Sequence, residues 1–488
     1  MPRDIQQHQW QRDTHPARLW TPQDDGSVTC HLSPRNCRIR DGSVGFCRVR
    51  VNRGGALYTL NYGKSVAMTE ENIETEAVFH FAPGARILSM GNIGCMMNCD
   101  YCHNWQTSQA IYVGDDVVRT YTPEQVVHEC LSRDINVISW TYNDPVVWHE
   151  FVLDTSALAH RHGIVNLYKS AFYIDAPAID ELTEVIDIFS LSLKSMDPVF
   201  YKRVTKGRLE PVLAGIEQVY RSGRHLELSM LLVTDSNDAP GEPEKVARWM
   251  LDHLDADVPL HYVRFHPDYK YVNVPRTPID RLVRAHDAAL EMGMRYVYLG
   301  NVYGQDGANT YCPDCRTMLI ERVGLRASIK SLSADSRCTA CGYQTPIRQP
   351  LAGSASQSFE PVDVSTHERA PFGWHGDINA VHIEVRNSGA DPCTVVAIST
   401  GGISDGQPLR VIPLEAGAEF RFMVSRTETD QAGITICHPG IDVRFFEVFD
   451  RAHYPTQSTA QVRHTSDAVP EPALLGMPSR RVGLATED

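Results

Sequence analysis

The sequence lacks long apolar runs and is poor in positive charge. No stretch reaches the roughly 18 consecutive apolar residues that a membrane helix needs, and the opening residues MPRDIQQHQWQRDTH are polar throughout. We therefore expect no signal peptide, no membrane partner and a reducing, cytoplasmic compartment. Lysine and arginine number 46 against 60 aspartates and glutamates, so the net charge is −14. A chain this acidic binds nucleic acid poorly, and we expect no nucleic-acid partner.

The 488 residues are too many for one ordinary domain and predict roughly two to four. A hydrophobic content of 42% and a charged content of 22% are typical of globular proteins and exclude wholesale disorder. The 13 cysteines are too few for a disulfide-dense scaffold. In a reducing compartment, clustered cysteines indicate metal binding or redox chemistry.

Strand and helix patterns alternate between residues 85 and 299. The predicted strands are 85–90, 136–141, 164–168, 188–193, 225–233, 260–265 and 295–299. The predicted helices are 122–131, 146–162, 210–222, 243–253, 279–292 and one that begins at Pro177. Thr122 is the expected N-cap of the first helix, with Gln125 completing a capping box. The alternation predicts an α/β fold with a parallel sheet, either an open wrap or a (β/α) barrel, with functional side chains at the carboxyl ends of the strands.

After Pro350 the composition changes. Residues 349–364 read as a linker, and alternating apolar and polar runs in 365–454 predict an antiparallel β domain, a sandwich. Trp374 and His375 at its start are candidate contacts, although a core position is the simpler interpretation for the tryptophan. The tail 455–488 is polar and non-periodic.

Three cysteines are closely spaced after the first of these strands. Cys95, Cys99 and Cys102 have the form C-x3-C-x2-C. A loop can wrap three such thiolates round an iron–sulfur cube, leaving one iron with an open position that an amino acid's amine and carboxylate can fill. The alternative interpretations are a zinc knuckle and coincidence.

This loop resembles that of the radical S-adenosylmethionine (SAM) superfamily, in which an aromatic residue precedes the third cysteine, as Tyr101 does here. The chain is most similar to the radical enzyme of the AmmeMemoRadiSam group, which resembles pyruvate formate-lyase activating enzymes. The similar segments lie within about residues 30–345 and read GNIGCMMNCDYCHNWQTSQ, SWTYNDPVVWHEFVLD, RLEPVLAGIEQV, VPLHYVRFHPDYK, GNVYG and NTYCPDC.

The resemblance implies a [4Fe–4S] cluster that chelates SAM. Reductive cleavage of SAM would yield a 5′-deoxyadenosyl radical that abstracts hydrogen from a peptide or protein side chain or a small metabolite. It also implies an electron donor such as ferredoxin or flavodoxin.

The resemblance further implies a set of SAM-binding residues. Asn143 and Asp144 match the loop that receives the SAM ammonium, Lys194 matches a lysine that pairs with the methionine carboxylate or ribose, and His266 matches a histidine that packs on the adenine. A His-x-Glu of relatives is matched by His225 and Glu227, and the following strand end and turn by Asn237 and Asp238. The last predicted strand ends at Gly300 and Asn301, which we expect to close the floor of the pocket. The predicted cofactor-binding set is Tyr101, Asn143, Asp144, Lys169, Ser170, Ser192, Lys194, Val233 and His266.

Two strand ends depart from the family pattern. Ser192 stands where relatives have an aspartate, and Lys169 and Ser170 stand in another changed strand end. In activating enzymes these two strand ends supply oxygens round a monovalent cation beside SAM. We hypothesise that the Lys169 ammonium replaces that cation; the alternative is a solvated strand-end lysine.

Four later cysteines form two close pairs. Cys312, Cys315, Cys338 and Cys341 have the spacing C-x2-C-x22-C-x2-C, which predicts a closed tetrahedral site for structural zinc, with iron as the alternative.

Three earlier cysteines, Cys30, Cys37 and Cys47, lie where relatives have four, with Ser33 in place of one. They either bind a metal with a further ligand such as His31 or have lost it, and we leave them unassigned. Cys130, Cys393 and Cys437 are predicted to be buried, apolar residues.

The predicted organisation is an N-terminal cysteine module at 1–80, the barrel at 81–305, a zinc-ribbon or rubredoxin-like module at 306–348, the linker at 349–364, the β-sandwich at 365–454 and the tail at 455–488. The predicted function is that of a radical SAM enzyme. The alternatives are activation of a glycyl-radical enzyme, natural-product chemistry on a small molecule, and a metal-binding interaction protein without catalysis.

Overall fold

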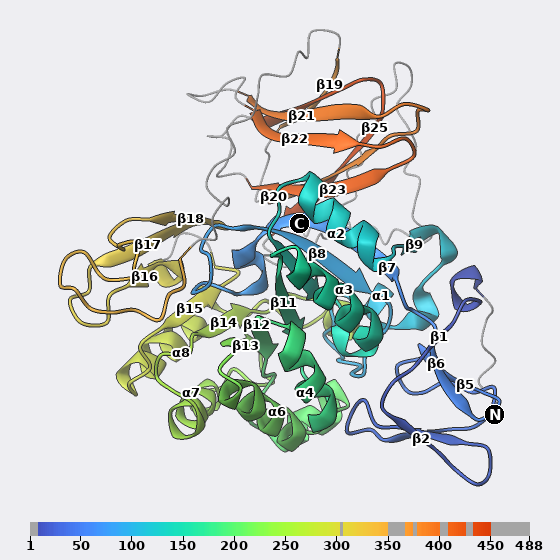
Figure 1. Ribbon diagram of the computed structural model, residues 1–488. Coiled ribbons are helices and arrows are strands. Elements are labelled where there is room, and N and C mark those ends of the chain that lie inside the picture. Colours follow the sequence, from blue (N-terminus) through green and yellow to red (C-terminus); the bar gives the residue numbers. More distant parts are fainter. Residues whose placement is uncertain are drawn as a thin grey trace, which may run out of the picture.

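The computed structural model describes residues 8–302, 306–349, 367–373, 378–400, 408–425 and 433–449. Trp374, His375, most of the predicted linker and the predicted tail lie outside these residues. The central element is a twelve-stranded sheet (Figure 1). None of the helices in the described ranges has the length and apolar character that a membrane crossing requires.

Parallel strands form the part of this sheet that carries the candidate site. They follow chain order from β8 to β15, each paired in parallel with the next. Because β8 pairs with β10 and β7 while β15 lies at the far edge, the barrel is partial rather than closed. The strands are β8 (Arg86–Asn92), β10 (Val137–Thr141), β11 (Val165–Ser170), β12 (Ile188–Ser192), β13 (His225–Leu232), β14 (Leu260–Arg264) and β15 (Val297–Gly300).

Helices connect the parallel strands and cover the outer face of the sheet (Figure 1). They are α2 (Pro123–Ser132), α3 (His149–Arg161), α4 (Ala176–Val185), α6 (Leu209–Arg221), α7 (Glu242–His253) and α8 (Ile279–Glu291), with the short α1 (Trp105–Ser108) and α5 (Pro198–Phe200) in loops. The predicted capping box is confirmed, because Gln125 N donates to Thr122 Oγ1 at 3.2 Å and Thr122 N donates to Gln125 Oε1 at 2.8 Å.

The second predicted helix is shorter than expected. The predicted range 146–162 begins with a 3-10 turn, Pro145–Trp148, before α3 starts. Asp144 caps this turn, since its Oδ1 accepts a hydrogen bond from Val146 N at 3.3 Å. The cap keeps Asp144 at the edge of the sheet.

The central sheet continues through β7 (Lys64–Asn72) into the C-terminal region. β7 lies in the range predicted for the N-terminal module, yet it pairs antiparallel with β8. On its other side it pairs in parallel with β23 (Glu419–Ser425), followed by β20 (Ile378–Arg386) and β25 (Asp442–Phe449). Figure 1 shows these strands beside the end of β7. The C-terminal strands are therefore physically continuous with the sheet of the barrel.

A second C-terminal sheet packs on these three strands. Its order is β19 (Glu368–Gly373), β24 (Gly433–His438), β21 (Cys393–Thr400) and β22 (Pro408–Leu414). The rings of Phe372 and Phe445 stack between the two sheets with 5.2 Å between centroids. Cys437 and Cys130 are buried, as predicted, and Cys393 is half-buried.

Three small sheets flank the barrel in the sequence, two before β7 and one after β15. The N-terminal ones are β1 (His15–Pro16), β6 (Ala56–Thr59) and β5 (Arg50–Arg53), and β2 (Trp20–Pro22), β3 (Val28–Cys30) and β4 (Cys37–Ile39). The third is β16 (Thr310–Tyr311), β17 (Met318–Val323) and β18 (Arg326–Ile329). The two-residue β9 (Arg119–Thr120) pairs with β7.

Candidate functional site

A cavity opens at the carboxyl ends of the parallel strands, with about 1040 Å³ of empty space that includes its opening to solvent. Loops after parallel strands place side chains at one edge, so this is where the fold predicts a site. Eleven of the predicted residues line the cavity: Cys95, Cys99, Tyr101, Cys102, Asn143, Asp144, Lys169, Ser170, Ser192, Lys194 and His266. Asn301 also lines it.

Val233 is the predicted residue that the cavity lining does not include. It is fully buried beside Tyr101, Phe200 and Phe265 in a small apolar cluster behind the cavity wall. Its side chain therefore supports the wall, and its N–H donates to Asn237 Oδ1 at 2.6 Å.

The cysteine loop is held by backbone contacts to the segment after α5. Asn98 N donates to Thr205 O at 3.2 Å, and Asp100 N donates to Val204 O at 3.1 Å. Asp100 also pairs with Lys206 at 2.7 Å and Lys270 at 2.8 Å. These contacts fix the loop on both sides of Cys99.

The three thiols of the loop are suited to an iron–sulfur cube. Met97 N donates to Cys95 Sγ at 3.3 Å, and Cys102 Sγ lies 3.4 Å from Ser108 Oγ. Burial raises the pKa of all three thiols, for Cys99 to about 12. A bound metal reverses this preference by stabilising thiolates. The loop therefore offers three neighbouring sulfur atoms, and a cube held by them would keep one iron open to a ligand in the cavity.

Asp144 presents a carboxylate oxygen to this cavity. Its Oδ1 accepts a hydrogen bond from Ser170 Oγ at 2.8 Å, whereas the buried Oδ2 has no hydrogen-bond partner among the described residues. Burial raises the pKa of Asp144, and the Ser170 hydroxyl and the charge of Lys194 oppose the shift. A buried carboxylate oxygen without a donor is costly, and a ligand ammonium would satisfy it.

Asn143 and Tyr142 shape the loop that presents Asp144. Tyr142 has a left-handed backbone with φ of 65°, and its carbonyl accepts a hydrogen bond from Asn104 Nδ2. Asn143 Nδ2 donates to Asn92 O at the end of β8, and its Oδ1 accepts from Thr107 Oγ1 at 3.1 Å. The Asn143 amide is thus a structural tie between the first two parallel strands.

Lys169 extends from β11 across the floor of the cavity. Its Nζ donates to Ser190 Oγ at 3.0 Å and to Ser229 Oγ at 3.2 Å, and Ser192 Oγ lies 3.1 Å from Ser229 Oγ. Burial lowers the pKa of Lys169 to about 8, while Glu76 raises it. An ammonium therefore lies among serine hydroxyls contributed by the two neighbouring strands β12 and β13.

His266 lines the cavity against a second histidine. The rings of His103 and His266 are stacked with 3.9 Å between centroids, and His103 Nε2 lies 3.0 Å from the carbonyl of His266. One face of His266 is therefore covered by protein.

Sequence reasoning missed several cavity residues. The cavity lining also includes residues to which we assigned no role, namely His103, Asn104, Tyr142 and Ser229. His103 and Asn104 directly follow Cys102, and Tyr142 directly precedes Asn143, so adjacency to the motifs was the available signal.

The predicted His225 and Glu227 lie on β13 outside the cavity lining, with Glu227 in register with Ser190 and Lys169. Glu227 is fully buried and accepts hydrogen bonds from Phe79 N at 2.9 Å and His80 N at 2.8 Å. Its oxygens also lie 2.9 Å from His225 Nε2 and 2.8 Å from His261 Nε2. Four donors occupy this carboxylate, so it ties the segment before β8 to β13 and β14.

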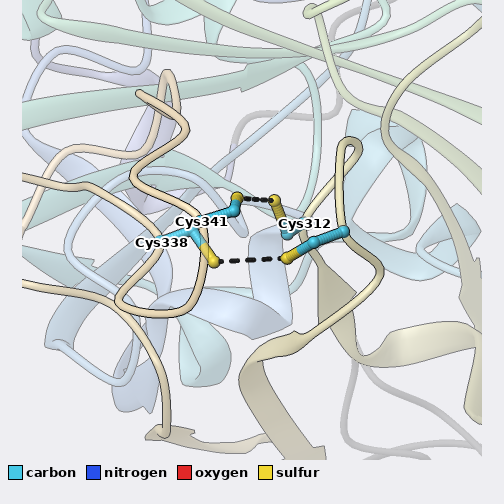
Figure 2. Close-up of side chains that lie close together, drawn as sticks. Cys312, Cys338 and Cys341 are labelled. Carbon is cyan, nitrogen blue, oxygen red and sulfur yellow. Dashed lines mark hydrogen bonds between the residues drawn. The ribbon is translucent and has the colours of Figure 1, made fainter.

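The four later cysteines form a candidate metal centre. The Sγ atoms of Cys312, Cys315, Cys338 and Cys341 all lie within 4.8 Å of one another. Figure 2 shows the pairs Cys312–Cys341 and Cys315–Cys338, each with 3.6 Å between sulfurs. Cys315 lies 3.3 Å from Thr317 Oγ1, and this contact lowers the pKa of the thiol to about 6. Four sulfurs that converge on one point suit a single tetrahedral ion.

Comparison with known proteins agrees with this geometry. Residues 92–250 match the model of the radical SAM superfamily. An uncharacterized protein of Methanocaldococcus jannaschii is 38% identical over 333 residues, which are 68% of this chain and 98% of the relative.

Two relatives with named activities are more distant. The benzylsuccinate synthase activating enzyme of Thauera aromatica is 22% identical over 47% of this chain and 74% of its own length. The pyruvate formate-lyase 1-activating enzyme of Escherichia coli K12 is 27% identical over 25% of this chain and 50% of its own length. The chain therefore belongs to the radical SAM superfamily and is an enzyme.

Proposed function

We propose that this enzyme holds a [4Fe–4S] cluster on Cys95, Cys99 and Cys102 and cleaves SAM to begin hydrogen abstraction from a peptide or protein side chain. Membership of the superfamily implies both cofactors. The observation that supports the proposal is the unpartnered Asp144 Oδ2, buried in a cavity that the three cysteines also line. When bound, the cluster supplies the single electron that cleaves the SAM sulfonium.

The protein's own groups would bind and orient SAM. Asp144 would accept a hydrogen bond from the methionine ammonium, and Lys194 would donate to its carboxylate or to the ribose. His266 would stack on the adenine through the face that His103 leaves open. The apolar wall behind Tyr101 would exclude water from the reactive carbon.

We propose that Lys169 replaces a bound monovalent cation in this site. Its ammonium already donates to serines of β12 and β13, at 3.0 and 3.2 Å, so the oxygens that would ligate a cation are engaged. The positive charge of Lys169 would attract the carboxylate of SAM, and no dissociable ion would be needed.

An aromatic group beside the cavity supports a macromolecular substrate. Trp105, two residues after His103, contacts the rings of Tyr112 and Tyr269, each with 5.2 Å between centroids. Tyr112 and its neighbour Ile111 are each 44% exposed, and Val272 is 58% exposed. Exposed apolar side chains beside a site favour a peptide or protein over a small polar metabolite.

A second candidate is activation of a glycyl-radical enzyme. Two relatives carry names of activating enzymes, which is the observation that favours it. Incubation with candidate glycyl-radical proteins and electron paramagnetic resonance would reveal a glycyl radical if this alternative holds.

Anaerobic incubation of the reconstituted enzyme with dithionite and SAM tests the main proposal. We expect 5′-deoxyadenosine from the wild type, none from C99A, and undiminished product from C130A, whose side chain is buried in α2. Product from C99A would refute the cluster assignment. The substrate is then sought by scoring increased 5′-deoxyadenosine with peptide mixtures and with small metabolites. Stimulation by metabolites alone would refute the proposed substrate class.

A further inference from the structure

Three cysteines outside the Cys95 loop gather at one hollow in the N-terminal module. Cys30 on β3 and Cys37 on β4 are direct cross-strand partners, and Cys47 lies in the turn before β5. All three line a hollow with about 310 Å³ of empty space, together with Ser33 and Arg50. These thiols form a group in space as well as in sequence.

Each of the three sulfurs faces a hydrogen-bond donor. Arg50 Nη1 donates to Cys30 Sγ at 3.8 Å. Backbone N–H groups donate to the other two thiols, that of Phe46 to Cys37 and that of Val49 to Cys47. Donors directed at sulfur are the usual surroundings of thiolates that hold iron–sulfur clusters.

The isolated Cys130 provides a contrast. It is fully buried in α2, and burial is the main influence that raises the pKa of its thiol, followed by the charges of Glu129 and Arg133. A cysteine that only fills space has such surroundings. The N-terminal Cys37 and Cys47 differ from Cys130 in the backbone N–H groups that donate to their sulfurs.

A half-buried cation, Arg35, lies between the two cysteine groups. The Arg35 guanidinium stacks on the Phe46 ring at 3.5 Å, and its Nε donates to Met96 O at 2.6 Å. No carboxylate in the described part of the chain forms an ion pair with it. A negatively charged centre at these cysteines would balance its charge.

The uncharged polar side chain beside the three cysteines in this hollow is Ser33 and not His31. His31 does not line the hollow, and both of its ring nitrogens have side-chain neighbours, at 2.9 Å from Thr21 Oγ1 and 2.9 Å from Asn36 Oδ1. Ser33 is buried and lines the hollow. Its hydroxyl is the oxygen available at the place of the missing cysteine.

The spacing of the sulfurs favours a cluster over a single ion. The Sγ atoms of Cys312, Cys315, Cys338 and Cys341 converge within 4.8 Å, the only such group in the described residues. The Cys95 loop does not meet this criterion, and a cube binds each thiolate on a different iron. As a set of three, the N-terminal cysteines also fall outside this 4.8 Å limit. We propose that Cys30, Cys37 and Cys47 hold a second iron–sulfur cluster, with the Ser33 hydroxyl at its fourth position.

This second site would lie in direct contact with the Cys95 loop. A Cβ added to Gly94 would lie 3.0 Å from Cys47 O, so the two backbones touch at this point. Cys47 and Cys95 also line a common pocket. Two reduced clusters this close would show magnetic interaction between their electron spins.

The test removes the loop cysteines and asks whether a cluster remains. We expect the C95A/C99A/C102A variant, reconstituted anaerobically, to retain about four acid-labile sulfides per chain and a signal in electron paramagnetic resonance after reduction. Adding C37A should abolish both, and adding C130A should leave both unchanged. Because this background lacks the loop ligands, the result does not depend on the proposed SAM cleavage.

Sulfide content separates the possible outcomes. Zinc, or iron without sulfide, in the C95A/C99A/C102A variant would overturn the proposal, since a four-cysteine iron site contains no sulfide. If that variant does not fold, the wild type decides: about eight sulfides per chain support two clusters and about four refute the second. The S33C substitution should slow the loss of the second cluster to a chelator, and no change relative to S33A would refute the assigned fourth position.

Discussion

The imidazole rings of His103 and His266 lie parallel, with 3.9 Å between their centroids and 8° between their planes. His103 directly follows the cysteine loop, whereas His266 follows β14, so the stack joins the predicted cluster loop to the predicted adenine contact. The pair also fixes the orientation of His266, because one face of its ring is covered.

The stack predicts unequal losses of SAM affinity when His266 and His103 are substituted. H266A removes the ring that would contact adenine, and because an aromatic contact contributes about 0.5–1.5 kcal/mol, we expect SAM affinity to fall about 2- to 10-fold. H103A should have a smaller effect, since it removes only the support. Equilibrium dialysis with the reconstituted enzyme measures both. Equal affinities for H266A and the wild type would refute the adenine contact.

Substitution of Asp144 should cost more SAM affinity than substitution of either histidine. D144N keeps the size of the side chain but removes the charge that would meet the SAM ammonium, a charge-assisted hydrogen bond of about 1.5–3 kcal/mol. We expect SAM affinity to fall about 10- to 100-fold, measured by the same dialysis. D116N, at an exposed loop position, is the control and should bind normally. If D144N also binds normally, the ammonium lies elsewhere.

Lys169 predicts a dependence on pH. Because burial lowers its pKa to about 8, the ammonium is present at pH 7 and is lost as the pH rises through about 8. SAM affinity should fall in that range. K169M should bind weakly at every pH and lose this dependence. Dissociation constants measured from pH 7 to about 9.5 test the expectation.

Titration of Lys169 has opposite effects on fold stability and on SAM affinity, so a fall in affinity at high pH cannot be caused by unfolding through this group. A lysine whose folded-state pKa lies below its usual 10.5 binds fewer protons folded than unfolded between about pH 8 and 10.5. Lys169 therefore makes the fold more stable as pH rises through that window, and its own titration cannot unfold the protein there.

A strong response of wild-type affinity for SAM to added sodium or potassium would refute replacement of the cation by Lys169.

The parallel strands themselves and most of the cavity-lining residues of the candidate site could be predicted from the sequence, whereas the order of the strands was left open between a wrap and a barrel. Thr122 and Gln125 formed the expected cap because the capping interaction is local, and the cysteine spacing of the loop is local as well. The stack of His103 on His266 could not be predicted, because 163 residues separate the two rings. The same holds for the pairing of Arg421 with Thr69, which joins the C-terminal strands to β7. His31 was a reasonable ligand by residue type, and only the structure shows that its nitrogens are engaged.

The four-cysteine site predicts loss of one metal ion on substitution. C312S removes a buried sulfur from a closed tetrahedral set, so we expect about one equivalent less zinc by elemental analysis and a lower melting temperature. C130A also removes a buried thiol but should leave the metal content unchanged. Equal metal content in C312S and the wild type would show that this set holds no ion, and loss of iron instead of zinc would identify the alternative metal.

Glu70 predicts how strongly the C-terminal strands are attached. Its carboxylate is 2% exposed and lies 2.6 Å from Arg86 Nε of the barrel and 2.8 Å from Arg410 Nε of β22. E70Q would leave two guanidinium groups beside a neutral amide, so we expect a loss of about 3–5 kcal/mol in stability, seen as a lower denaturation midpoint.

An exposed ion pair that also joins the C-terminal strands to the rest of the central sheet is the control for Glu70. Glu419 lies 3.2 Å from Arg119, with side chains 26% and 43% exposed, so E419Q should cost less than about 1 kcal/mol. Burial raises the pKa of Glu70, but the charges of Arg86 and Arg410 outweigh it and the pKa is lowered. Its contribution to stability is therefore complete above the usual glutamate pKa of 4.5 and is lost as pH falls further, so the difference between wild type and E70Q should shrink in acid. A difference that is equal for E70Q and E419Q, or constant with pH, would show that this buried carboxylate does not stabilise the junction.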